Sequence, residues 1–179
     1  MRKLENNELN RPGAEEYQEV VKMPVTVVHD NIRSCHNIGS VLRTSDALLV
    51  EKIYLCGISS TPPDKEIRKT ALGAENTVPW EYFASTPEAV ADLKAKGYTL
   101  IAVEQVENSV SLKEYFPPQN TRLALVFGNE VKGVQQDVVN QCDLALEIPQ
   151  FGTKHSFNIS VSVGIVLWDL FNKITPDRF

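Results

Sequence analysis

Residues 143–158 read DLALEIPQFGTKHSFN, and this stretch indicates most clearly how the chain folds. A short apolar strand, Asp143 to Ile148, stops at Pro149 and gives way to a polar segment. Ser156 and Asn158 end that segment and lie at the start of a buried helix, where a polar side chain can cap the helix or contact a bound molecule. Capping is the commoner use. The apolar positions of that helix are Ile159, Val163, Val166, Leu167, Leu170 and Phe171.

The same alternation of strand and helix extends through the rest of the chain. Such alternation predicts an α/β fold with a mostly parallel sheet and helices on both faces. Thr86 with Pro87 is typical of a helix start, and Gly73 and Gly97 are typical of helix ends. The charged residues 1–23 are expected to form an N-terminal extension with one or two helical turns, and residues 24–179 the domain. The predicted strands are 25–29, 52–56, 78–83, 98–103, 123–127 and 144–148, and the predicted helices are 38–49, 64–72, 87–96, 134–140 and 158–172.

Composition excludes several classes of protein. A chain of 179 residues suits one domain that buries about 70% of its unfolded surface. With 18 Lys and Arg against 23 Asp and Glu, the net charge of -5 means that any contact with nucleic acid needs a local basic patch. Cys35, Cys56 and Cys142 are odd in number and far apart, which fits neither a disulfide framework nor zinc. No apolar run is long enough for a membrane span, and we expect a cytoplasmic protein.

Several familiar catalytic motifs are absent from the sequence. Residues 128–133 lack the Lys-Ser/Thr pair of a P-loop, and no G-x-G-x-x-G follows the first strand. The histidines, at positions 29, 36 and 155, have no second ligand at metal-binding spacing, so no metal is expected. Ser156, His155 and Asp143 could form a hydrolase triad on paper, but the G-x-S-x-G elbow is missing.

Three polar segments follow predicted strands, and ligands collect at the carboxyl ends of parallel strands. The first is residues 30–47, DNIRSCHNIGSVLRTSDA, whose predicted helix places Ser40, Arg43 and Ala47 on one stripe. The second is residues 125–133, LVFGNEVKG, a buried strand that ends in two glycines around an Asn-Glu pair. The third is the segment after Ile148. Their shared position predicts one binding site at this edge of the sheet.

Together the three segments resemble the motifs of the SpoU, or TrmH-like, branch of the SPOUT RNA methyltransferases. The first motif is similar to residues 31–47, the second to 125–133 and the third to 148–162, in the family's order. The resemblance covers about residues 24–173 and departs from the family at Cys35 and Phe157, neither of which removes a polar group needed for chemistry. It implies a deep trefoil knot at the C-terminal end of the domain. It also implies a homodimer joined through the first and last helices of the domain.

The resemblance further implies S-adenosylmethionine as cofactor and methyl transfer to a ribose 2′-hydroxyl of tRNA or rRNA. Gly128 would let the backbone approach the cofactor, and Pro149 would stop the strand so that its last carbonyls are free. A basic patch for RNA is expected, although ordinary solvated charges are the alternative reading. The catalytic residues would be Arg43, Asn37, Glu130, Ser156 and Asn158; the cofactor residues Phe127, Gly128, Asn129, Ile148, Pro149 and Phe157; the RNA-binding residues Arg33, Arg68, Lys69, Lys132 and Lys154.

Arg43 is the residue that the resemblance ties most closely to catalysis. A role as proton acceptor conflicts with the pKa of a free guanidinium, about 12.5 to 13.8, because neutralising it at pH 7 would cost about 8 kcal/mol. A bidentate clamp on the phosphate beside the target ribose suits its geometry better. Two alternatives remain open for the whole chain. One is an RNA-binding or assembly module that keeps the fold without turnover, and the other is a doubly wound enzyme acting on a small molecule.

Overall fold

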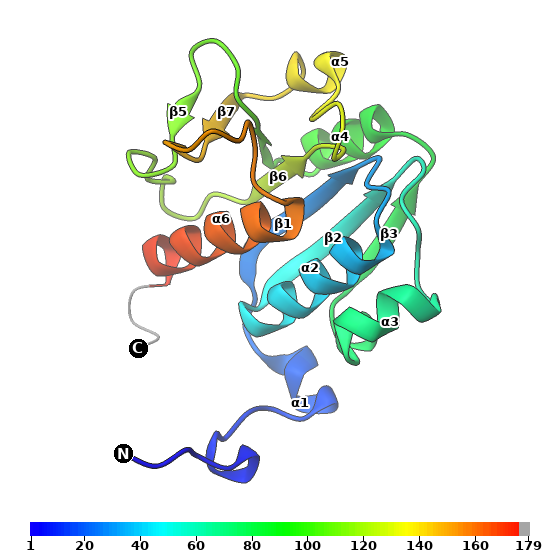
Figure 1. Cartoon of the computed structure of the whole chain (residues 1–179), viewed down its shortest axis with the longest axis vertical. Coiled ribbons are helices and arrows are strands. Elements are labelled where there is room, and N and C mark those ends of the chain that lie inside the picture. The colour runs from blue at the N-terminus through cyan, green and yellow to red at the C-terminus, as the bar shows by residue number, and fades with distance from the viewer. Residues whose placement is uncertain (176–179) are drawn as a thin grey trace.

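The computed structural model describes residues 1–175, in which seven strands form one sheet (Figure 1). Their order across the sheet is β3-β2-β1-β6-β4-β7-β5, and every neighbouring pair is parallel. The predicted α/β class with a parallel sheet is confirmed. The strands are β1 (Met23–Asp30), β2 (Val50–Cys56), β3 (Trp80–Phe83), β4 (Thr99–Val103), β5 (Val110–Ser111), β6 (Leu123–Phe127) and β7 (Leu144–Glu147).

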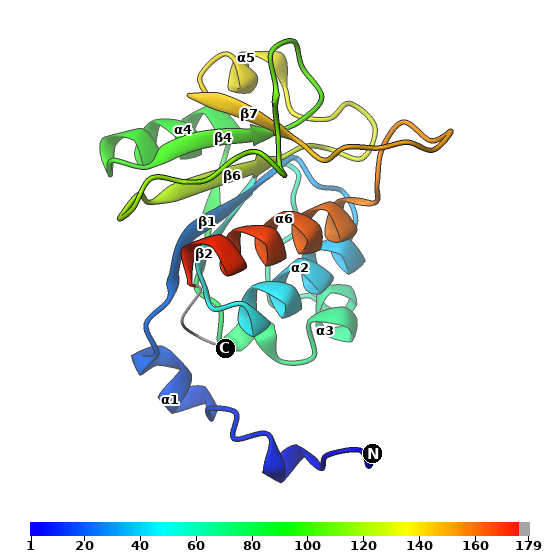
Figure 2. The same cartoon turned by 90° about the vertical axis from the view of Figure 1, so that its left-hand side faces the viewer.

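Helices cover both faces of the sheet (Figure 2). Helices α2, α3 and α6 lie on one face, while α4 and α5 lie on the other. Helix α1 lies beside the sheet, just before β1. The helices are α1 (Ala14–Glu19), α2 (Cys35–Ala47), α3 (Lys65–Ala71), α4 (Thr86–Ala95), α5 (Gln136–Val139) and α6 (Ile159–Ile174), with 3-10 turns η1 (Asn6–Glu8) and η2 (Ala74–Asn76).

Capping side chains explain where helix boundaries differ from the predicted ones. Helix α2 begins at Cys35 because the Ser34 hydroxyl accepts the N–H of Asn37 at 3.3 Å. The predicted cap of α4 at Thr86 is wrong, since Ser85 caps this helix by accepting the N–H of Glu88 at 3.4 Å. Thr86 is buried instead and donates to the Asp30 carboxylate at 2.5 Å.

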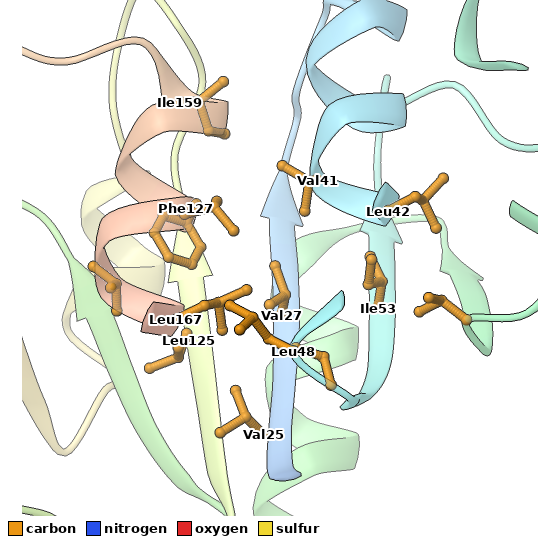
Figure 3. Packing of buried hydrophobic residues seen from close by; sticks show 14 of the residues in the cluster. Val25, Val27, Val41, Leu42, Leu48, Ile53, Leu125, Phe127, Ile159 and Leu167 are labelled. Atoms are coloured by element: carbon orange, nitrogen blue, oxygen red, sulfur yellow. The ribbon is translucent and has the colours of Figure 1, made fainter. Parts of the chain in front are cut away.

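Buried side chains alternate between the two faces of the central strands. Val25 and Val27 of β1 pack toward α2 and α6 (Figure 3), whereas Val28 packs toward α4 and α5. Every residue of β6 is buried, as expected for a central parallel strand covered on both sides. The core therefore consists of two apolar layers on either side of the sheet.

The strand order places all three motif segments at one edge of the sheet. From β1 the chain passes outward through β2 to β3 and then crosses to the other side of β1, where β6 lies between β1 and β4. β1 and β6 are therefore neighbours at the point where the strand order reverses. The carboxyl ends of β1, β6, β4 and β7 meet beside this point, where parallel sheets bind their ligands. The predicted knot stays a prediction. None of the helices formed by the described residues 1–175 has the length and apolar character to cross a membrane.

Candidate functional site

A cavity of about 490 Å³ opens at the carboxyl ends of β4, β6 and β7 and at the start of α6. Its size lies within the range of small-molecule sites. Pro149, one of the six predicted cofactor residues, does not line the cavity, but its neighbours Ile148 and Gln150 do. The predicted cofactor residues that do line it are Phe127, Gly128, Asn129, Ile148 and Phe157, and predicted catalytic or RNA-binding residues in the lining are Glu130, Lys132, Ser156 and Asn158.

The loop after β6 folds back on itself and forms one wall of the cavity. Asn129 and Gly133 exchange backbone hydrogen bonds of 3.0 and 2.9 Å, and the Asn129 amide donates to the Asn31 carbonyl at 2.7 Å. A Cβ atom at Gly128 would overlap the backbone of Gly133 and Val134. Glycine is therefore required at position 128 by the loop's own backbone, and the close approach to a cofactor stays a prediction.

Glu130 links the second motif to the first. Its carboxylate accepts the N–H groups of Arg33 and Ser34 at 3.1 and 3.2 Å and the Asn37 amide at 3.1 Å. Partial burial acts to raise the pKa of Glu130, but hydrogen bonds from its own backbone and from these three residues outweigh it and lower the pKa overall. The carboxylate is therefore ionised at neutral pH and holds the start of α2.

Asn158 links the third motif to the same group. Its side-chain oxygen caps α6 by accepting the N–H of Ser160 at 2.9 Å, while its amide donates to the Asn37 side-chain oxygen at 3.2 Å. Asn158 therefore caps the helix, the commoner of the two uses, and its contact with a bound molecule stays a prediction. A chain of hydrogen bonds thus runs from Glu130 through Asn37 to Asn158 and joins all three motifs. Ser156 lies two residues before this cap, in the cavity lining.

Residues at the end of β4 also belong to the site, and the sequence reading missed them. The Glu104 carboxylate accepts the N–H of Val134 at 3.0 Å, and the Gln105 amide donates to the His155 carbonyl at 2.9 Å. Glu104 and Gln105 therefore brace the loops on either side of the cavity. They directly follow a predicted strand, so the rule that ligands collect at strand ends could have found them.

The charges in the cavity lining favour a cationic ligand. Glu104, Glu130 and Glu147 contribute three carboxylates, against the single ammonium group of Lys132. Opposite charges attract more strongly in a partly enclosed site than in open water.

Arg43 does not line this cavity. It is exposed and lies six residues after Asn37 on α2, which places it about 9 Å further along the helix axis. It lines a different cavity, between α2 and residues 10–20. Within one chain the structure therefore brings four of the five predicted catalytic residues together. Glu130, Ser156 and Asn158 line the cavity, and Asn37 is hydrogen-bonded to Glu130 and Asn158. Arg43 lies apart from them.

The predicted RNA-binding residues occupy several different places. Lys132 lines the cavity, and Lys154 is exposed in the loop before α6. Arg33 contributes a backbone N–H to Glu130. Arg68 lines a separate cavity beside Trp80, whereas Lys69 forms an ion pair of 2.7 Å with Glu66.

His29 is an unexpected buried group beneath the site. It is fully buried on β1, paired in register with Phe127, and neither ring nitrogen has a hydrogen-bond partner among residues 1–175. Burial lowers the pKa of His29 to about 4, with the charge of Glu130 acting in the opposite direction. The imidazole is therefore neutral at pH 7.

Comparison with known proteins gives a consistent set of relatives. Residues 24–168 match the model of the SpoU rRNA Methylase family. The chain is 33% identical over 144 residues to the 23S rRNA (guanosine-2'-O-)-methyltransferase RlmB of Neisseria meningitidis, covering 80% of this chain and 56% of that protein. It thus spans less than two thirds of the length of the curated relatives that it matches first.

Solved structures show the same fold. The A. aeolicus TrmH/SpoU tRNA modifying enzyme superimposes with a TM-score of 0.78 at 26% identity, covering 89% of this chain and 81% of that one. The AdoMet-bound rRNA methyltransferase from Sinorhizobium meliloti superimposes with a TM-score of 0.77 at 24% identity, covering 86% of this chain and 59% of that one.

Proposed function

Because the chain belongs to the SpoU rRNA methylase family, we propose that it transfers a methyl group from S-adenosylmethionine to a ribose 2′-hydroxyl of RNA. The observation that carries the proposal is the hydrogen-bonded chain from Glu130 through Asn37 to Asn158, which joins the three motifs beside the cavity. The Neisseria relative is named as a 2′-O-methyltransferase of 23S rRNA and the A. aeolicus structure as a tRNA modifying enzyme, so rRNA and tRNA are the substrates proposed here.

S-adenosylmethionine suits the cavity in size and charge. The cavity of about 490 Å³ has room for a nucleoside with an amino-acid tail, and its carboxylates suit the positive sulfonium. When bound, the cofactor supplies an activated methyl group. Residues that would hold it are Phe127, Gly128, Asn129, Ile148 and Phe157, with Pro149 ending the strand beside them.

The protein's remaining tasks are to align the ribose hydroxyl and to assist removal of its proton. Glu130 is a weak base, because its carboxylate accepts three hydrogen bonds and its pKa is lowered. We therefore assign Glu130 to holding Asn37, and we assign Asn37, Ser156 and Asn158 to orienting the ribose. Arg43 clamps the phosphate beside it, a role that suits a planar guanidinium.

The position of Arg43 supports a homodimer as part of the proposal. Since this residue lies outside its own chain's cavity, a reaction that uses both needs a second subunit. Helix α6 also exposes Val161 (47%) and Trp168 (53%), with half-buried Ile165 between them at helical spacing. Together with Ser40, Arg43 and Ala47 on α2, this apolar stripe supports a dimer joined through α2 and α6.

Three further parts of the proposal concern the protein as a whole. Residues 24–179 form the methyltransferase domain and residues 1–23 an extension to it, although positions 176–179 lie outside the described residues. Turnover is independent of metal, and the protein works in the cytoplasm. Limited proteolysis, a chelator added to the assay and cell fractionation test these parts in turn.

The experiment that tests the proposed activity combines two measurements on the purified protein. Calorimetry should detect S-adenosylmethionine binding, and labelled methyl groups should pass to unmodified total RNA. RNA binding without transfer would favour the assembly module over the enzyme. The absence of cofactor binding at millimolar concentration would reject the cofactor and leave a small-molecule enzyme as the reading to pursue.

A further inference from the structure

A second cavity, of about 1240 Å³, lies between α2 and the N-terminal residues 1–22, which we call the arm. The arm runs beneath α2 and the turn η2 (Figure 1). The cavity brings Arg11 of the arm and Arg43 of α2 to the same space. Its volume exceeds the usual range for sites that take one small molecule, which suits a segment of a polymer.

The two arginines have unused hydrogen-bonding capacity. Both are exposed, and neither guanidinium has a hydrogen-bond or ion-pair partner among the side chains and backbone that the structure describes. Two carboxylates also line the cavity and balance the two guanidinium charges; Asp46 accepts the Thr77 hydroxyl at 2.5 Å, and Glu16 accepts the N–H of Gly13 at 2.9 Å. The two guanidinium groups are N–H donors without partners in the described part of the chain, and such donors suit an anionic or other acceptor-rich ligand.

Tyr17, in the wall of the same cavity, carries a further donor without a partner in residues 1–175. This residue lines the same cavity and is 4% exposed, yet its hydroxyl is buried and has no hydrogen-bond partner among the described residues. Burial, helped by the charge of Asp46, raises the pKa of Tyr17 to about 12, so the hydroxyl keeps its proton and can donate. The adjacent Gln18 amide donates to the Thr77 carbonyl at 3.1 Å and fixes the arm on the body of the protein.

We propose that this cavity binds the phosphodiester backbone of the substrate RNA beside the target ribose, with Arg11 as a positioning residue next to Arg43. The inference rests on the proposed function and extends it to the arm. Two guanidinium groups suit phosphate oxygens because each presents parallel N–H donors. Arg11 thereby supplies some of the positive charge that an acidic protein must gather locally to bind RNA.

The test compares Arg11→Ala with Arg2→Ala, a control on the same arm. Arg2 does not line the cavity and is already paired with Glu8 at 2.5 Å. Binding of a short oligouridylate is measured over a series of salt concentrations, and methyl transfer is measured on unmodified bulk RNA from cells that lack the protein. Calorimetry with S-adenosylmethionine and light scattering report whether the cofactor site and the oligomeric state are intact.

Arg11→Ala should weaken oligouridylate binding about tenfold and lower the slope of log affinity against log salt by about 0.7 to 0.9. The KM for RNA should rise while kcat at saturating RNA stays within about twofold of the unmodified protein, which a merely structural role would not predict. Arg11→Lys should restore the salt slope but not the full affinity, because an ammonium lacks the bidentate geometry. Arg2→Ala should behave as the unmodified protein.

Equal RNA affinity, salt slope and KM for Arg11→Ala and Arg2→Ala would overturn the inference, provided that the unmodified protein methylates RNA. Failure of the proposed function is a separate result, in which the unmodified protein neither binds S-adenosylmethionine nor transfers methyl groups. Dependence of oligouridylate binding on Arg11 would in that case still support the cavity as a phosphate-binding surface.

Discussion

Replacing Glu130 with alanine should detach the loop at residues 128–133 from the start of α2. The carboxylate accepts three hydrogen bonds there, from Arg33, Ser34 and Asn37. Hydrogen bonds to charged groups contribute about 1.5 to 3 kcal/mol each when shielded from water. Glu130 is exposed, so solvent screening reduces this sum, and we expect Glu130→Ala to lower the free energy of unfolding by about 1 to 2 kcal/mol in total.

Glu130→Gln provides a matched control of nearly the same shape. One carboxylate oxygen accepts the bonds from Ser34 and Asn37, and the other accepts the bond from Arg33. A glutamine keeps one acceptor oxygen and replaces the other with an NH₂ group, so it can retain the first two bonds but not the third. Its loss in the free energy of unfolding should be smaller than that of alanine, by about half.

Urea unfolding at pH 7 measures the loss of stability. Calorimetry measures the weaker binding of S-adenosylmethionine expected when residues 128–133, which line the cavity, are detached. Because the pKa of Glu130 is lowered in the folded protein, its stabilising contribution is present above the unfolded value of about 4.3 and is lost as the pH falls through the folded value. The difference in stability between the unmodified protein and Glu130→Ala should therefore shrink in acid. Equal stability and equal cofactor affinity at pH 7 would refute the role of Glu130.

Substitutions at three other positions and one mass measurement extend these expectations. Arg43→Ala and Arg43→Lys should each lower labelled-methyl transfer by several powers of ten with cofactor affinity by calorimetry unchanged, because Arg43 lies outside the cofactor cavity; near-normal turnover would contradict this. Asn158→Ala should lower cofactor affinity and activity together, and loss of its cap should reduce the free energy of unfolding by about 1 kcal/mol; an effect on stability alone would exclude a role at the site. His29→Leu should remove an acid-sensitive loss of stability. The folded pKa of His29, about 4, lies below the unfolded value of about 6.5, so the unmodified protein loses up to about 3 kcal/mol as the pH falls between them, and urea unfolding of the variant should lack this slope. Light scattering should give about twice the chain mass of 20.0 kDa, and a monomer at micromolar concentration would reject the shared site.

The sequence predicted the sheet well where apolar runs are long and their ends are marked. The predicted strand 123–127 matches β6, because an unbroken apolar run is bounded by Arg122 and Gly128. The two-residue strand β5 was missed, since no periodic pattern exists at that length. Helix α5 is shorter than the predicted 134–140, because the N–H of Val134 bonds to Glu104 and only Gln136–Val139 is helical.

The sequence also predicted part of the site, because the positions of the strand ends could be read from it. The three motifs follow predicted strands, so their meeting at one edge of the sheet followed from parallel topology. The partners of Glu130 and the separate cavity of Arg43 depend on side-chain contacts across the fold, which no local pattern contains. The cavity beside the arm depends on the packing of a single buried residue, Tyr17, among charged neighbours, which leaves no periodic signal in the sequence.

The most direct test of the central claim is a map of ribose methylation in RNA from cells with and without this protein. The account predicts that at least one tRNA or rRNA nucleotide carries a 2′-O-methyl group only when the protein is present. It also predicts that the purified protein with S-adenosylmethionine restores that group on RNA from the deficient cells, and that Arg43→Ala does not. Identical ribose methylation in both RNA samples, or a lost methyl group that lies on a base, would contradict the account.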